Sequence, residues 1–308
     1  MLTKRTIKDI LAKHAMFFLA CAVSLLVIFI FGGLFFKSST ILKNKPLAEL
    51  LFSVDWHPSR GNFGFAPFIM GTIWVTVVAI FLAVPASLLT AIFLAEYAHK
   101  KIRGVIKPVL DLLAGISPVI FGVFGILVIV PFVGNGLKPF CEKFLGFIPF
   151  FRSDNFTGYS VLSAGIVLAI MIFPTMAQVA EEVVNSVPQE TRESSLALGA
   201  TKWETIKYVV VKKAGAGIIA AIILGLSRAF GETIAVLMVV GNVIKVPHSL
   251  FDAAYTLPAL IANNYGEMMS IPLYDSALLL AALILLAVTV FFNIGAWFIL
   301  LRIEKSYV

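Results

Sequence analysis

The sequence predicts an all-α integral membrane protein with six transmembrane helices. Of its 308 residues, 60% are hydrophobic and 13% are charged, against roughly 45–50% and 25% in soluble domains. Uncharged stretches recur at about the 20 residues that a helix needs to cross a hydrocarbon core of roughly 30 Å. These stretches are continuously apolar, whereas the strands of a membrane barrel alternate in polarity over about ten residues. The composition therefore excludes a soluble globule, and the pattern favours helices.

Six apolar stretches are the candidate spans, in chain order. Three of them contain internal prolines (Pro85, Pro118 and Pro131, and Pro174), which a membrane helix tolerates when neighbouring helices satisfy the freed carbonyl groups. We therefore expect kinked, packed helices. The spans are expected at residues 15–36, 68–94, 109–133, 159–176, 216–241 and 277–301.

The distribution of Lys and Arg predicts that both termini are cytoplasmic. Basic residues are concentrated before the first span, in the second and fourth loops, and after the last span, and cytoplasmic loops carry the excess of Lys and Arg. The net charge of +7 is therefore a sign of membrane topology, and no nucleic-acid partner is expected. The first span is too long for a signal peptide and is interpreted as a retained anchor. The chain then divides into a cytoplasmic segment (1–14), one transmembrane domain (15–301) and a cytoplasmic tail (302–308).

The fourth loop, residues 177–215, is longer than a connection between two spans requires. A helix is expected after Pro188 and ends near Gly199, because glycine suits the left-handed end of a helix. Thr201 and Glu204 have the spacing of a capping box, which predicts a second helix start. This helical pair is either a docking element for a cytoplasmic partner or a surface hairpin that only links two spans.

Two motifs resemble a known family. Glu193-Ser194-Ser195 followed by Gly199 resembles the EAA loop of ABC importer permeases, although serines replace the alanines and Val209, Val211 and Lys212 stand where Ile, Leu and Pro are usual. The segment 226–233, Leu-Ser-Arg-Ala-Phe-Gly-Glu-Thr, resembles the R-A-x-G-E-T signature of phosphate-specific ABC permeases. The residues that follow it are more similar to the PstC type than to the PstA type.

This resemblance implies a MetI-like type I importer permease in the cytoplasmic membrane of a prokaryote. It implies a second, PstA-like permease, two PstB-like ATPase subunits that use ATP and Mg²⁺, and an extracytoplasmic PstS-like phosphate-binding protein. This chain itself would bind no cofactor and no metal. The candidate ATPase contacts in the loop are Glu193, Ala197, Leu198, Gly199 and Trp203. Trp203 has a second interpretation as an anchor at the bilayer surface.

Arg228 and Glu232 are the candidate pathway residues. An Arg at the centre of a membrane helix costs at least ~2.5 kcal/mol, so it should face water or the bundle interior and have a partner. Glu232 follows four residues later and would lie on the same helical face, where the two side chains can pair. A guanidinium matches phosphate oxygens, but a sealed ion pair between helices is the structural alternative. Ser227 and Thr233 add hydroxyl groups nearby.

The sequence contains no energy source of its own. It has no G-x-x-x-x-G-K-[ST] phosphate loop, and Glu232 is the only acid well inside an apolar span, which does not suffice for a proton relay. The chain is therefore expected to be a transport subunit and not an enzyme. Permeases for sulfate, molybdate or phosphonate are the nearest alternatives, followed by an ion-coupled secondary transporter. Whether the chain pairs with a second permease or with its own copy stays open.

Overall fold

The computed structural model describes residues 4–266, 271 and 273–305 and is almost entirely helical in these ranges. The long helices are α1 (Lys4–Asn44), α3 (Ala66–Ile92), α4 (Lys100–Gly115), α8 (Val161–Ser186), α12 (Gly215–Gly231) and α15 (Tyr274–Lys305). The shorter helices are α2 (Leu47–Phe52), α5 (Pro118–Phe124), α6 (Val130–Phe132), α7 (Lys138–Leu145), α9 (Gln189–Ala197), α10 (Lys202–Glu204), α11 (Val211–Lys213), α13 (Ile234–Val239) and α14 (Leu257–Asn264). Strands β1 (Trp56–His57) and β2 (Asn62–Phe63) form one small antiparallel hairpin.

Within the described ranges, five helices are long and apolar enough to cross a membrane, or six if one bent pair counts as a span. In this bent pair, Lys202–Lys213 meets Gly215–Gly231 at 69°. The predicted spans at 68–94 and 277–301 coincide with α3 and α15. The span predicted at 159–176 coincides with the start of α8, which continues to Ser186. Ten residues that were assigned to the fourth loop therefore belong to this helix.

The span predicted at 109–133 is not one helix. α4 ends at Gly115 and α5 begins at Pro118, and the apolar candidate span is Pro118–Phe144. Ser117 is extended (ψ 139°), because the residue before a proline is sterically driven out of the helical region. α4 instead runs beside α8, where Lys107 Nζ lies 2.7 Å from the buried carboxylate of Glu181. The prolyl break thus separates the basic helix α4 from the span.

The span predicted at 216–241 is also broken. α12 ends at Gly231, Glu232 is extended (ψ 126°), and a separate short helix, α13, begins at Ile234. The apolar composition of the stretch was correctly recognised, but composition alone does not show where helical hydrogen bonding stops. The continuous fifth helix was therefore a wrong prediction.

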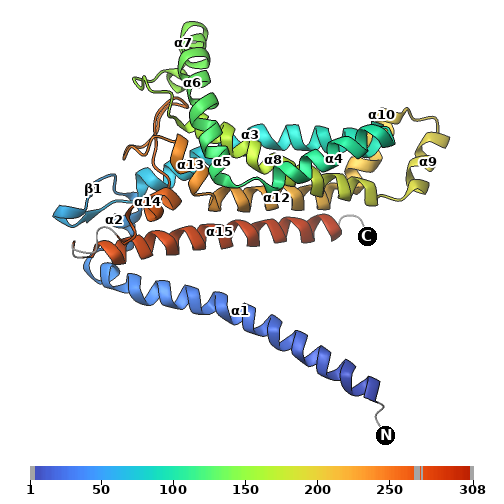
Figure 1. Ribbon diagram of the computed structural model, residues 1–308, viewed down its shortest axis with the longest axis horizontal. Coiled ribbons are helices and arrows are strands. Elements are labelled where there is room, and N and C mark those ends of the chain that lie inside the picture. The colour runs from blue at the N-terminus through green and yellow to red at the C-terminus, as the bar shows by residue number, and fades with distance from the viewer. Residues whose placement is uncertain (1–3, 267–270, 272, 306–308) are drawn as a thin grey trace.

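The core lies where α3 packs against α8, the most extensive helix pairing in the described chain. Gly165 on α8 makes the close approach possible, because a Cβ atom there would lie 2.4 Å from Cγ1 of Val78 on α3. Large apolar side chains such as Leu168 and Ile172 are fully buried beside this contact. α12 packs along α3 and α8, so the fifth apolar segment lies against the rigid part of the molecule (Figure 1).

α1 diverges from the other helices toward its amino-terminal end (Figure 1). None of its most apolar 18-residue window is buried within the chain. Its apolar side chains are therefore available to lipid or to another subunit. The amino-terminal end of α1 and the carboxyl-terminal end of α15 point toward the end of the molecule that carries α9 and α10 (Figure 1). This arrangement agrees with the prediction that both termini lie on one side of the membrane.

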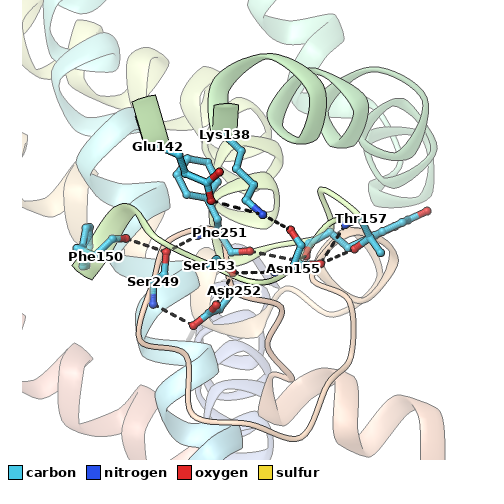
Figure 2. A network of polar contacts seen from close by, with 10 residues as sticks. Lys138, Glu142, Phe150, Ser153, Asn155, Thr157, Ser249, Phe251 and Asp252 are labelled. Carbon is cyan, nitrogen blue, oxygen red and sulfur yellow. Dashed lines mark hydrogen bonds and ion pairs between the residues drawn. The ribbon is translucent and has the colours of Figure 1, made fainter. Parts of the chain in front are cut away.

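A polar network joins two loops at the opposite end of the bundle (Figure 2). Asp252 accepts hydrogen bonds from the hydroxyl of Ser153 (2.6 Å) and from the amides of His248 (3.0 Å) and Ser249 (3.1 Å). The side-chain amide of Asn155 donates to the carbonyl of Phe251 (3.0 Å). These contacts hold the segment before α8 against the segment after α13.

Candidate functional site

Arg228 lies in the last turn of α12, three residues before the helix ends. Its side chain is half-buried, and Nη1 donates a hydrogen bond to Oγ1 of Thr175 on α8 (2.7 Å). A guanidinium has five N–H donors, so this contact leaves donors that can bind a further acceptor. Thr175 follows Pro174 in the middle of α8, and it was not predicted as a site residue.

The expected ion pair between Arg228 and Glu232 is not among the ion pairs of the described residues. The helix ends at Gly231, so Glu232 does not stand one turn above Arg228 on a common face. Its carboxylate instead accepts a hydrogen bond from the amide of Ala235 (3.2 Å) in the first turn of α13. The predicted pairing was wrong, and the alternative of a sealed ion pair falls with it.

The two hydroxyl groups have different partners. Ser227 donates to Oδ1 of Asn293 on α15 (2.9 Å), whereas Thr233 donates to the carbonyl of Gly231 (3.3 Å) beside the break. The bond of Thr233 to its neighbouring backbone is the common structural role of a membrane hydroxyl. Ser227 instead connects α12 to α15, and Asn293 is a second polar residue that the sequence did not reveal.

The break at Glu232 and Thr233 has a physical consequence in a membrane. Non-helical backbone at membrane depth is tolerated only where it is buried in protein or lines a water-filled cavity. Both residues are only partly buried within this chain. Interrupted membrane helices are also where transporters place substrate sites. The break and Arg228 together define the pathway candidate.

The fourth loop forms the helical pair that the sequence predicts. α9 ends at Ala197, Gly199 has a left-handed backbone (φ +87°), and α10 begins after Thr201. The Thr201 and Glu204 capping box is present, with Glu204 accepting from the amide of Thr201 (2.8 Å). α9 lies beyond the ends of α8 and α12 (Figure 1).

All five candidate contact residues of the loop are exposed: Glu193, Ala197, Leu198, Gly199 and Trp203. The side chain of Leu198 is 90% exposed and that of Trp203 is 54% exposed. An exposed Leu at the tip of a cytoplasmic loop is suited to a protein partner, because burial of its apolar surface there would be favourable. All five residues are therefore accessible to a partner.

The structure also reveals a charged contact that sequence reasoning missed. Arg192 on α9 pairs with Glu96 at the end of α3, with 2.8 Å between Nη2 and Oε1. The two residues are 96 positions apart, and neither lies in a predicted motif position. The only hint of this contact in the sequence is that the acidic residue Glu96 comes just after an apolar stretch.

Comparison with known proteins identifies the class. Residues 83–304 match the family described as binding-protein-dependent transport system inner membrane component. Two solved structures share the fold: a bacterial alginate ABC transporter (TM-score 0.60, 16% identity, 96% of each chain covered) and the inward-facing MetNI methionine ABC transporter (TM-score 0.55, 18% identity, 76% of this chain and 93% of that chain). The chain belongs to this family of membrane components, and it is not the ATPase of such a transporter.

The curated relatives narrow the class to PstC-type permeases. The phosphate transport system permease protein PstC of Xylella fastidiosa (strain 9a5c) is 37% identical over 262 residues, which cover 84% of this chain and 80% of the relative. PstC of Mesorhizobium japonicum is 34% identical over 290 residues, 92% of this chain and 88% of the relative. The probable ABC transporter permease YqgH of Bacillus subtilis is 36% identical over 279 residues, 89% of this chain and 85% of the relative.

Proposed function

We propose that this chain is a permease subunit of an ATP-driven importer that carries inorganic phosphate across the cytoplasmic membrane. The observation that carries the proposal is the position of Arg228 close to the break between α12 and α13. The chain that contains it is similar to phosphate permeases over most of its length. A half-buried guanidinium with free donors offers transient hydrogen bonds to phosphate oxygens.

Glu232 has a defined role in this proposal. Its carboxylate binds the first turn of α13 and so stabilises the interrupted backbone next to the pathway. The same carboxylate can also accept a hydrogen bond from the hydroxyl group of a protonated phosphate. Sulfate carries no such proton at neutral pH. Glu232 therefore supports both the shape of the pathway and the preference for phosphate over sulfate.

Partner subunits supply the energy. Membership of the family makes the chain one component of a binding-protein-dependent transporter. The proposal adds two ATPase subunits that use ATP and Mg²⁺, a second permease and an extracytoplasmic phosphate-binding protein. The ATPase subunits would dock on the exposed tip of the fourth loop, which includes Glu193, Leu198 and Trp203. ATP binding would then move this loop and open the pathway.

Uptake of radioactive phosphate into proteoliposomes tests the proposal. The assembled transporter should accumulate phosphate when ATP and binding protein are present, and the purified chain alone should not. Arg228→Gln and Glu232→Gln should each reduce uptake, while the variants still assemble with their partners. Substitution of Asn44, a polar residue in the last turn of α1, by Gln is the matched control and should leave uptake unchanged.

Three results would contradict this proposal. Normal uptake by both pathway variants would remove Arg228 and Glu232 from the mechanism. Preferential transport of sulfate would assign a different oxyanion. Flux through the chain alone, driven by an ion gradient, would indicate a secondary transporter.

A further inference from the structure

An ion pair attaches the fourth loop to a helix that the polypeptide does not connect to it directly. Arg192 on α9 donates from Nη2 (2.8 Å) and from Nε (2.9 Å) to Oε1 of Glu96, which lies at the end of the α3 segment. Their side chains are only 12% and 9% exposed. A charged hydrogen-bonded pair shielded from water is strong and geometrically specific.

Arg192 and Lys202 make four further contacts around this ion pair. Arg192 also donates to the carbonyls of Val184 (2.8 Å) and Val187 at the end of α8. Lys202 on α10 donates to the backbone carbonyl of Glu96 (2.6 Å) and lies over the ring of Tyr97 (4.5 Å). Both helices that flank Gly199 are therefore bound to the end of α3. We call Glu96, Arg192 and Lys202 the clamp.

The interface is hollow beside the clamp. A cavity of about 450 Å³ lies beside the clamp, and its lining includes Asn185, Gln189 and Thr205 as well as the three clamp residues. The loop is thus held to the end of α3 by these polar contacts around a hollow, and by an apolar cluster in which Val210 packs with Leu88 and Ala95. Loss of a clamp contact should loosen the loop from α3 without removing a hydrophobic core.

Two π-helical segments lie at or near the clamp. Glu96 belongs to the segment η2 (Phe93–Tyr97), and Lys202 precedes the segment η6 (Thr205–Val210). π-helical turns are rare and occur frequently at functional sites. Glu96, the acceptor of the clamp, lies within one of these turns.

We propose that the clamp residues are positioning residues for transport, which transmit movement of the fourth loop to α3. The chain itself joins the loop to α8 and α12, so these two helices follow the loop through covalent bonds. α3 is joined to the loop indirectly through its packing on α8 and directly through the clamp. The direct attachment is what makes the loop move with α3 and α8 as one unit. This inference rests on the proposed docking of ATPase subunits on the loop.

Distance measurements between spin labels test the inference in the assembled transporter. The labels are attached to Leu89→Cys on α3 and Tyr208→Cys on η6, whose side chains are 66% and 61% exposed, after Cys21 and Cys141 are replaced by Ser. With the clamp intact, the distance between the labels should be the same with and without ATP. In Glu96→Gln and Arg192→Gln, the distance should change when ATP binds. Phosphate transported per ATP should also fall in these two variants.

Glu181→Gln is the matched control. Glu181 is a buried carboxylate near the same end of α8, and it pairs with Arg103 and Lys107 of α4. This variant perturbs a buried charge without touching the loop, so its label distance should stay insensitive to ATP. Arg192→Lys keeps the charge but loses the planar fork, and it should show a smaller ATP-dependent change than Arg192→Gln.

An ATP-dependent distance in the unaltered transporter would overturn the inference, and so would an ATP-independent distance in the clamp variants. If the Gln variants do not assemble and Arg192→Lys keeps a constant distance, the pair serves folding only, and the inference is again overturned. The label distances do not depend on the cargo. Transport of an oxyanion other than phosphate would therefore contradict the proposed function and leave the clamp result valid.

Discussion

The behaviour of Arg228 depends on the residues that face it. Its observed partner is the hydroxyl of Thr175 and not the carboxylate of Glu232. A neutral hydroxyl orients the guanidinium without neutralising its charge. The positive charge therefore stays available to an anion, whereas a tight carboxylate pair would compete with the anion for the same donors.

Thr175→Val should impair transport because it removes the hydrogen-bond acceptor that orients Arg228 while preserving the shape of the side chain. We expect phosphate uptake to fall about tenfold, which corresponds to about 1.4 kcal/mol and lies near the low end for hydrogen bonds to charged groups. Initial rates in proteoliposomes measure the effect. Thr175→Ser retains the hydroxyl and should transport nearly normally; equal impairment of both variants would show that the hydroxyl has no such role.

Single residues were predictable from the sequence only where the signal is local. Arg228 is conspicuous because a charge interrupts an apolar stretch, and Gly199 because it separates two helical patterns. Thr175 and Asn293 are ordinary polar residues within spans, and their roles come from contacts with α12 across 53 and 66 positions of chain. Such pairings depend on how helices are arranged in space, which composition and periodicity do not specify.

The positions where helices end were also only partly predictable from the sequence. Hydropathy located the apolar stretches, and α1, α3, α8 and α15 lie where four of them were predicted. It did not locate the interruptions at Ser117 and at Glu232, because apolar residues continue on both sides of each. A proline preceded by an extended residue explains the first interruption, and the carboxylate that binds the start of α13 stabilises the second.

The loop network around Asp252 leads to a pH prediction. Burial alone would raise the pKa of Asp252, but hydrogen bonds from Ser153 and from the amides of His248 and Ser249 outweigh it and lower the pKa below its usual value. An unfolded Asp titrates near ~3.9. Because folding favours the ionised form, Asp252 stabilises the protein above this pH, and the contribution is lost as the pH falls through the lower folded pKa.

Thermal unfolding of the purified chain in detergent at several pH values measures this effect. Asp252→Asn should unfold at a lower temperature than the unaltered chain at neutral pH, and should lose less additional stability in acid. Asp154→Asn is the control, because Asp154 is exposed in the same loop region. An unchanged pH dependence in Asp252→Asn would show that the network does not rely on its charge.

The whole molecule combines a rigid core with two peripheral regions. α3 and α8 form the core, α12 carries Arg228 alongside it, and the fourth loop projects from one end (Figure 1). α1 diverges from the core and leaves its apolar surface for lipid or another subunit. This arrangement suits one half of a transport pathway whose remaining wall and energy source come from other chains.

Thiol labelling at position 228 tests the central claim most directly. Arg228→Cys is introduced into the assembled transporter after Cys21 and Cys141 are replaced by Ser, and a charged, membrane-impermeant thiol reagent is applied in the resting, ATP-bound and cycling states. If Arg228 lines a water-filled phosphate pathway, the new thiol should react in at least one of these states. A thiol that stays unreactive in all three states would place position 228 in a dry helix contact and contradict the proposed pathway.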